Sequence, residues 1–313
     1  MHAAAISPRG GVSPRSTRLR GQSIIEYVLI IAVIGLVIVF AGPGVAGAIR
    51  NQFNQVTNTV DSGTDGGNFM SAEEKAYQEA MKTVVNKEAK DWTLDEQKAA
   101  ATDIAKNGTS SVVYAKAKAA MEAGTKFSAK LTNGKTLEYR IVGINHDDLA
   151  DGSGKAGMTF EATNTALGAQ RMNATQTNAG GWEQSELRGR LNSGDLWSLL
   201  PSELQSKVKT VKKMTDNKGG GTAGTPSATA DKVFLLSTTE VYGNFQSDGA
   251  QYEYYKSKGV TTSSYSGASS SAYHWTRSVY PSHSTYFRGV SSYGDYYNNY
   301  ATNTNYVFPA FSF

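Results

Sequence analysis

The sequence predicts an α+β protein that combines a long N-terminal transmembrane helix, a helical stalk, and a C-terminal domain of small twisted sheets and long loops. Three observations support this fold class. An apolar run covers residues 24–41, a stretch rich in Ala, Lys, Glu and Gln covers 71–123, and alternating apolar and polar residues begin at Lys126. These patterns are typical of membrane helices, solvated helices and strands, respectively.

A basic leader precedes the apolar run, and the run contains one early carboxylate. Residues 1–21 carry Arg but no acid, which places the N-terminus on the cytoplasmic side of a membrane. As a helix the run would measure about 27 Å, close to the ~30 Å of a hydrocarbon core. A carboxylate such as Glu26 inside a membrane helix is costly and usually functional. A plain anchor leaves Glu26 unexplained, and a secretory signal would have to use the weak cleavage site at 46–48.

Residues 21–27, GQSIIEY, resemble the processing site of Flp-type (class IVb) prepilins. The resemblance covers residues 15 to about 60 and implies that a prepilin peptidase cuts after Gly21, leaving Gln22 as the new N-terminus. It also implies that Glu26 and Tyr27 serve assembly with other pilin subunits. In a filament, Glu26 can pair with the free amine of a neighbouring subunit, which offsets both burial costs. Because Flp pilins are usually very short, this longer chain resembles a minor or tip subunit, or a pseudopilin-like protein.

Composition argues against several classes of function. The 313 residues include 31 Lys+Arg and 27 Asp+Glu, and four of the Arg lie in the leader. The remainder is therefore formally neutral, which gives no support for nucleic-acid binding. With no Cys, disulfides, cysteine catalysis and cysteine-ligated zinc are excluded. No phosphate-loop or dinucleotide fingerprint is present, and we predict neither a cofactor nor a metal site nor an enzyme.

The segment between the apolar helix and the first strand is predicted to be a linker followed by a stalk. Residues 22–60 form the pilin-like helix, 61–70 the linker and 71–124 the helical stalk. Ser71 and Thr93 each begin a candidate capping box. Residues 107–108, Asn-Gly, should end one of the helices.

Residues 125–313 are predicted to form a binding domain. Two strand-like runs flank the Asn-Gly pair at 133–134, which is a strong hairpin signal. A helix is expected over 185–192, capped by Ser185, and a buried strand over 233–237. The acidic loop at 147–151 lacks the spacing of a calcium loop and is interpreted as a solvated turn.

The C-terminal part of the chain differs in composition from the rest. Thirteen of the 17 Tyr lie beyond residue 240, and residues 273–306 are dominated by Tyr, Ser, Asn and Thr without any Lys or Glu. This composition is typical of antibody combining sites, where rigid Tyr supplies contact area and small polar residues supply adaptable hydrogen bonds. The alternative is a low-complexity polar loop, but Trp275, Phe287 and Val290 indicate short strands that carry the tract.

The tract therefore predicts a surface that binds an unknown protein or glycan ligand. The predicted ligand-binding residues are Tyr273, His274, Tyr280, His283, Tyr286, Tyr293, Asp295, Tyr296, Tyr297, Asn298 and Tyr300. A Ser–His–Asp site could be assembled from His274, Asp295 and one of many Ser, but so many Ser make this match expected by chance.

Several short stretches are similar to a bacterial surface domain of unknown function. They are Trp182, residues 187–188, 231–237 (DKVFLLS), 275–278 (WTRS) and 308–311 (FPAF). That domain looks related to the C-type-lectin-like and formylglycine-generating-enzyme folds, which implies small sheets, two helices and long recognition loops over about 126–313. The calcium-binding tripeptide of sugar-binding lectins and the cysteines of the enzyme branch are absent from this chain.

Some C-type-lectin-like proteins are targets of diversity-generating retroelements, which mutate adenines in codons just ahead of a constant tail. Scrambled Asn codons encode residues such as Tyr, Ser and Asn, and never Lys, Glu, Met or Trp. Residues 279–306 suit that output, and residues 307–313, VFPAFSF, suit the constant tail. We hypothesise a variable protein of this kind. A relative with a naturally Tyr- and Asn-rich loop is the alternative.

Taken together, these features predict a surface-displayed minor or tip pilin that acts in cell adhesion. It would be inserted in the membrane through residues 24–41 before assembly, and would then lie at the cell surface or in a pilus with an extracellular C-terminal domain. The rival interpretation is a structural pilus or secretion-machine subunit without a ligand of its own, whose Tyr tract forms a subunit interface. A membrane-anchored hydrolase is a third.

Overall fold

The computed structural model describes residues 70–313, which belong to one compact unit. The predicted processing residues, assembly residues and apolar run lie outside this range (Gly21, Gln22, Glu26, Tyr27 and 24–41). No helix within residues 70–313 combines the length and the apolar character needed to cross a bilayer.

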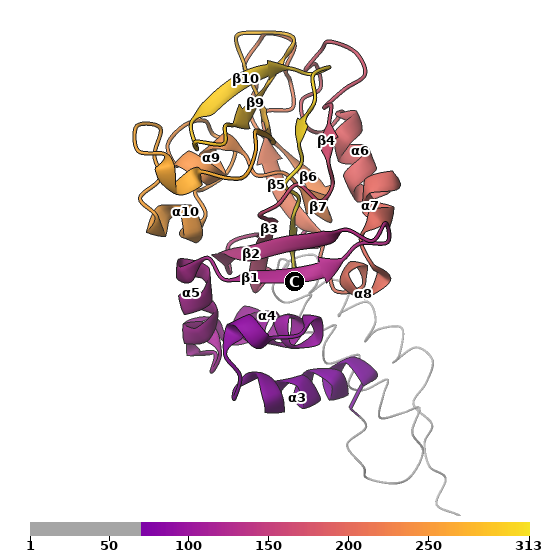
Figure 1. Cartoon of the computed structure of the whole chain (residues 1–313), viewed down its shortest axis with the longest axis vertical. Coiled ribbons are helices and arrows are strands. Elements are labelled where there is room, and N and C mark those ends of the chain that lie inside the picture. The colour runs from indigo at the N-terminus through magenta and orange to yellow at the C-terminus, as the bar shows by residue number, and fades with distance from the viewer. Residues whose placement is uncertain (1–69) are drawn as a thin grey trace, which may run out of the picture. The chain divides into compact units, whose positions relative to one another are not determined.

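The described chain is a mixed α/β unit of helices and three small sheets (Figure 1). The helices are α3 (Ala72–Val84), α4 (Leu94–Asn107), α5 (Tyr114–Ala123), α6 (Glu186–Asn192), α7 (Asp195–Leu199), α8 (Ser202–Gln205), α9 (Thr238–Tyr242) and α10 (Glu253–Ser257). The strands are β1 (Lys126–Lys130), β2 (Thr136–Ile144), β3 (Met158–Ala162), β4 (Ala169–Gln170), β5 (Val211–Thr215), β6 (Ser227–Asp231), β7 (Val233–Phe234), β8 (His274–Val279), β9 (Tyr286–Val290), β10 (Tyr296–Tyr300), β11 (Asn305–Tyr306) and β12 (Ala310–Ser312).

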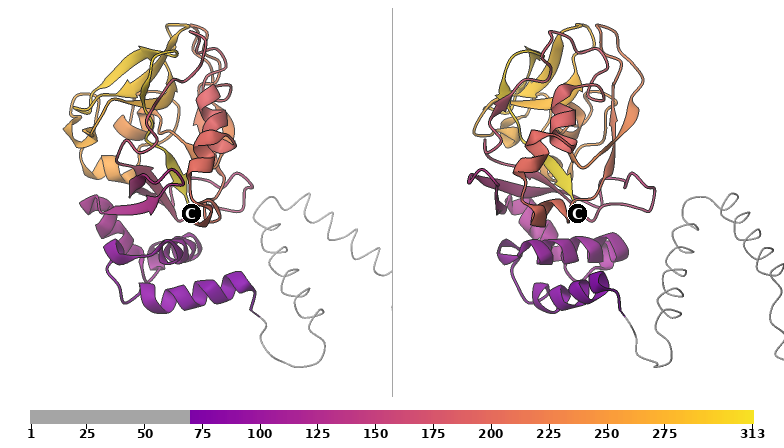
Figure 2. Two further views of the ribbon diagram at one scale, coloured as in Figure 1. Left: turned by 45° about the vertical axis from the view of Figure 1, so that its right-hand side comes forward. Right: turned by 90° about the vertical axis from the view of Figure 1, so that its right-hand side faces the viewer.

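The predicted fold class was wrong. The described residues form a mixed α/β unit in which α3–α5 make a layer packed under the first sheet rather than a free stalk (Figure 2). The hydroxyl of Tyr139 on β2 donates to Gln97 Oε1 on α4 over 3.1 Å. A Cβ on Gly157 would lie 1.8 Å from the carbonyl oxygen of Ala101 on α4. The helices bury their apolar faces on the sheet because a half-apolar helix gains most of its stability from such packing.

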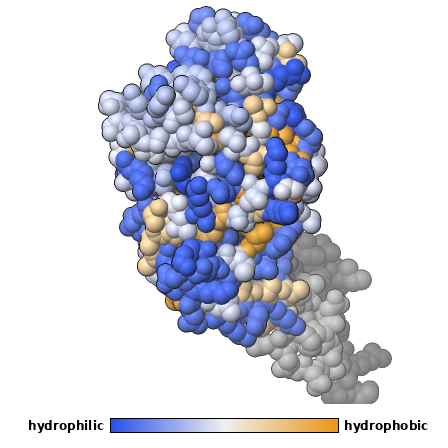
Figure 3. Space-filling model, in the orientation of Figure 1, coloured by the Kyte–Doolittle hydropathy of each residue, from blue (hydrophilic) through white to orange (hydrophobic). Residues whose placement is uncertain are grey.

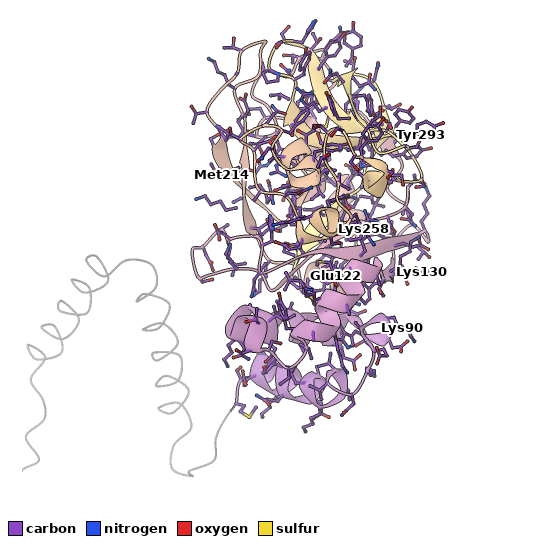
Figure 4. The ribbon with its side chains drawn as sticks, turned by 90° about the vertical axis from the view of Figure 1, so that its left-hand side faces the viewer. Lys90, Glu122, Lys130, Met214, Lys258 and Tyr293 are labelled. Atoms are coloured by element: carbon purple, nitrogen blue, oxygen red, sulfur yellow. The ribbon has the colours of Figure 1, made fainter. Side chains whose placement is uncertain are left out.

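Local signals predicted the helix ends well. Thr93 forms a full capping box with Glu96 at the start of α4, and the Ser71 hydroxyl accepts from the Glu74 amide at the start of α3. Gly108, at φ 56°, ends α4 as predicted. At the far end of the helical layer, Lys258 Nζ donates to the carbonyl of Glu122 over 2.7 Å, so α10 is tied to α5 (Figure 4).

The first sheet has the strand order β1-β2-β3-β12-β7. The predicted Asn-Gly hairpin joins β1 to β2, with Gly134 at φ 83°. Strand β12 follows the Tyr tract in sequence, yet it lies between β3 and β7 and pairs antiparallel with both. Phe311 on β12 stacks on Phe160 at 5.6 Å between ring centroids. Residues from both sides of the Tyr tract therefore complete one core.

The second sheet has the strand order β10-β9-β8-β11-β4 and carries most of the Tyr tract. Strand β8 is buried along its whole length, whereas β10 alternates between exposed and half-buried residues. Alternation with a period of two is the pattern of a strand with one face more covered than the other.

A chain of buried ion pairs fixes β8 to the rest of the unit. Arg277 on β8 contacts Glu240 on α9, Glu240 contacts Lys213 on β5 (2.6 Å), and Lys213 contacts Asp147 (2.5 Å). All four side chains are buried. Burial alone would raise the carboxyl pKa values of Glu240 and Asp147, but the adjacent Arg and Lys charges lower both. The sheet beneath the Tyr tract is therefore held by charges as well as by apolar packing.

Candidate binding surface on the second sheet

Strand β10 forms an outer edge of the second sheet (Figure 1). It pairs on one side only, antiparallel with β9, so that Asn298 lies opposite Arg288 and Tyr300 lies opposite Tyr286. Residues that face each other in this way have adjacent side chains on the same face of the sheet. Tyr296, Asn298 and Tyr300 therefore share one face of β10.

The turn between β9 and β10 is fixed by a glycine. The Ser291 amide donates to the Asp295 carbonyl over 2.8 Å, and Gly294 adopts a φ of 97°. A Cβ on Gly294 would lie 2.1 Å from the carbonyl oxygen of Tyr265, so a larger residue would displace that loop. The hydroxyl of buried Tyr242 donates to the Gly294 carbonyl over 2.5 Å, which anchors the turn to α9.

The exposed aromatic residues gather on this sheet and its loops. Every exposed Tyr, Trp or Phe among residues 70–313 is a Tyr between positions 265 and 306, and we call this set the tyrosine surface: Tyr265, Tyr273, Tyr293, Tyr296, Tyr300 and Tyr306. Tyr293 is the most exposed, at 74%, and projects away from the ribbon in Figure 4. Beside α9, Figure 3 shows a pale patch that contrasts with the deep blue of charged side chains elsewhere on that face.

Four rings stand together at the end of the sheet where β9 begins. Tyr286 contacts Tyr300 at 4.5 Å and His283 at 4.7 Å between ring centroids, and Tyr280 stacks nearly parallel to His283 at 5.9 Å. The loop that carries Tyr280 and His283 is held by buried Asn178, whose Nδ2 donates to the carbonyls of His283 and Tyr286 over 2.7 Å each. This arrangement holds the rings in place before any partner arrives, which lowers the entropy cost of binding.

A second aromatic group surrounds Arg288, and we call it the Arg288 platform. The guanidinium carbon lies 4.6 Å from the ring centroid of Phe245, 4.9 Å from that of Tyr280 and 5.7 Å from that of Tyr296. Cations over aromatic faces are stabilised by the ring quadrupole. The composition of the tract did not single out Arg288 or Phe245, and the signal that could have found Arg288 is that it is one of only two Arg residues in 273–306.

Tyr297 lies on the opposite face of β10 and fills space over Gly289. A Cβ on Gly289 would lie 2.7 Å from the Tyr297 ring, and Tyr273 contacts that ring edge-on at 5.2 Å. The Tyr297 hydroxyl is buried, which raises its pKa, and it makes no hydrogen bond of good geometry among the described residues, although the Asn305 side chain lies close enough to lower that pKa by a smaller amount. Tyr297 is therefore a packing residue that supports Tyr273 rather than an exposed contact.

The remaining predicted site residues differ in how much a partner could reach them. Tyr273, His283, Tyr293, Tyr296, Asn298 and Tyr300 are exposed. Asp295 is half-buried and accepts a hydrogen bond from the Ser291 hydroxyl. His274 is buried and stacks on Phe308 at 4.3 Å between ring centroids. Burial lowers the pKa of His274 to about 4.

The Ser–His–Asp site that the sequence offered is not assembled in the described residues. His274 contacts Ser270 and the Ala272 carbonyl, and Asp295 contacts Ser291, so the two residues do not form a Ser–His–Asp arrangement with each other. Within residues 70–313 there is no group of three or more His, Asp or Glu side chains placed to hold a metal ion.

Comparison with known proteins gives one result. No curated protein and no solved structure was found to match the chain. A family model described as Domain of unknown function (DUF6273) matches residues 156–313. The match runs from just before β3 to β12 and includes the whole tyrosine surface. Since it covers half of the chain, this protein belongs to the DUF6273 family.

Proposed function

We propose that this protein is a surface-displayed binding protein that holds a macromolecular partner, a protein or a glycan, on its tyrosine surface. The supporting observation is the concentration of all exposed Tyr, Trp and Phe of residues 70–313 on one sheet and its loops. Tyr is enriched at binding surfaces because it offers a large, rigid and amphipathic contact at low entropic cost. Isolated exposed aromatics would not need this explanation, but a gathered set does.

The scaffold beneath the surface supports the same proposal. The strands that carry the exposed Tyr rest on β8, which is fully buried and pinned through Arg277. Binding residues on a rigid support lose little freedom on association. Display at the cell surface is supported by the resemblance of residues 21–27 to a prepilin processing site.

A triple substitution of exposed Tyr tests the proposal. In the full-length chain, Tyr273→Ser, Tyr293→Ser and Tyr300→Ser together should abolish binding to partners selected on glycan arrays and from peptide libraries. Removing three anchors at ~1–2 kcal/mol each weakens affinity by at least a hundredfold. The matched control is Val112→Ser, which alters an exposed apolar residue on the helical layer (69% exposed) and should leave binding unchanged. Retained binding by the triple variant contradicts the proposal.

The triple Tyr variant also distinguishes ligand binding from a purely structural role. A structural subunit would use the Tyr side chains as an interface between copies, so the wild-type chain would self-associate with rising concentration and the triple variant would not. Sedimentation of both proteins over a concentration series gives that result directly. Self-association that depends on these Tyr, without any ligand, would favour the structural role.

A further inference from the structure

Arg288 is a buried cation without a counter-charge. Its side chain is only 8% exposed, and it forms no ion pair with any residue between 70 and 313. The other buried cations among these residues behave differently: Arg277 pairs with Glu240, and Lys213 pairs with both Glu240 and Asp147. A buried charge that lacks a partner is costly, and proteins rarely keep one without a reason.

The hydrogen bonds of Arg288 are also incomplete. Its Nε is buried and has no partner among the described residues. Its one side-chain hydrogen bond runs from Nη1 to Asn298 Oδ1 on β10, at a long 3.4 Å. Burial lowers the pKa of Arg288, against weaker opposing effects of Tyr296, Tyr280 and Asp248. The rings of the Arg288 platform offset part of the burial cost, but they cannot accept the unused N–H groups as an anion would.

The free edge of β10 lies directly beside this cation. In an antiparallel pair, inward hydrogen bonds alternate with residues whose N–H and C=O groups point away. The bonds from Ser291 to Asp295 and from Ala301 to Thr285, 2.8 and 2.9 Å, fix which positions pair inward.

It follows that the backbone groups of Tyr296 and Asn298 point away from β9. No described residue bonds to them, whereas the next outward carbonyl, that of Tyr300, accepts from Asn303 over 2.9 Å. The stretch of unpaired backbone on β10 is therefore short, and it ends before Tyr300, whose carbonyl is already hydrogen-bonded. Asn298, in its centre, is the residue whose side chain reaches Arg288.

We propose that the partner of the tyrosine surface presents an extended acidic peptide segment, which adds a strand to β10 at Tyr296 and Asn298 and places an Asp or Glu carboxylate against Arg288. This inference rests on the proposed function. Strand addition uses the free backbone groups, and a carboxylate is the anion whose geometry matches the guanidinium fork. An acidic glycan would supply the charge but would leave the strand edge unpaired, so the peptide accounts for both observations.

The test is a selection from a random 12-residue peptide library on the full-length chain. Selected peptides should carry an Asp or Glu at a recurring position, and replacing that residue by Asn or Gln should weaken binding roughly 30-fold or more. The Arg288→Gln variant should give a loss of similar size for the acidic peptide and little further loss for its amide counterpart. The ligand-side substitution keeps the test decisive even where Arg288→Gln fails to fold, as judged by thermal unfolding.

Two substitutions at Asn298 test the strand. Asn298→Pro removes an outward N–H and leaves the bonds to β9 intact, so it should weaken peptide binding about fivefold or more. Asn298→Ala keeps that N–H and is the matched control, with a smaller loss. Equal losses in the two variants contradict strand addition.

The outcomes separate this inference from the function it rests on. Peptides that bind through the exposed Tyr but show no acidic position and tolerate Arg288→Gln overturn the inference and leave the proposed function standing. Binding of polygalacturonate through Arg288, with no peptide selected, also overturns it in favour of a glycan. If neither peptides nor glycans bind the wild-type chain, both proposals fail.

Discussion

Arg277 and Arg288 lie on neighbouring strands of the same sheet, yet their surroundings are opposite. Arg277 is fully buried and meets Glu240 through two nitrogens at 2.5 and 2.8 Å. Arg288 meets only rings and one Asn oxygen. The Arg277 ion pair is complete within the chain and stabilises the fold. Arg288 lacks an anion, which is why we assign it to the binding of a partner.

His274 makes the described unit sensitive to mild acid. It stacks on Phe308 in the core, where burial lowers its pKa to about 4 from an unfolded value near 6.5. The unfolded chain therefore takes up a proton first as the pH falls, and stability is lost between about pH 6.5 and 4. We expect the free energy of unfolding to drop by on the order of 2 kcal/mol between pH 7 and 5 from this residue.

Urea unfolding of the wild type and of His274→Gln at both pH values measures that loss. The pKa of His146 is raised overall, because hydrogen bonding to Glu253 and nearby carboxylates outweigh its burial, so its own contribution has the opposite sign. The difference between the two proteins isolates His274. A pH dependence that is the same in both would contradict the assignment.

At the scale of single elements, strand β10 shows what the sequence could and could not predict. The Tyr-rich composition predicted a contact surface, and Trp275 and Phe287 predicted the strands beneath it. The different roles of the residues in 296–300 (YYNNY) were not predictable, because they depend on Gly289 across the strand pair and on the loop that holds Phe245. Tyr296 is consequently exposed beside Phe245, whereas its neighbour Tyr297 packs over Gly289.

Substitutions on β10 and its turn should separate packing from contact. Tyr297→Ser should destabilise the unit by about 1–3 kcal/mol, because it empties the space over Gly289. Tyr293→Ser should change stability by less than about 0.5 kcal/mol, since this side chain is mostly exposed. Tyr297→Phe should be neutral or stabilising, because it removes a buried hydroxyl that makes no hydrogen bond of good geometry. Denaturant unfolding of the three variants checks the order, and equal losses for Tyr297→Ser and Tyr293→Ser would contradict it.

At the scale of the whole molecule, the helices α3–α5 show where the sequence argument failed. Their caps and ends were predicted from local signals, and Thr93 and Gly108 confirm them. Their partner was not predictable, because the apolar positions give a face but not the surface it meets. Gly157 is the residue that permits the close approach of α4 to the sheet, and nothing in the sequence connects the two.

The N-terminal processing remains a prediction at this scale. If a prepilin peptidase cuts after Gly21, mass spectrometry of the chain from a membrane fraction should find Gln22 as the first residue. The Gly21→Ala variant should abolish that product, while Ser7→Ala, which lies before the region of resemblance, should not. Recovery of the intact leader in the wild type would remove the support for display through this route.

The position of β12 makes formation of the first sheet depend on translation of the chain to its last strand. Residues 310–312 are read after the whole Tyr tract, and they occupy an interior place between β3 and β7. The first sheet cannot close until the ribosome has translated the tract in the correct frame. A frameshift or premature stop anywhere in the tract would therefore leave a gap in the middle of that sheet. Substitutions at the exposed positions keep β12 in place and open no such gap.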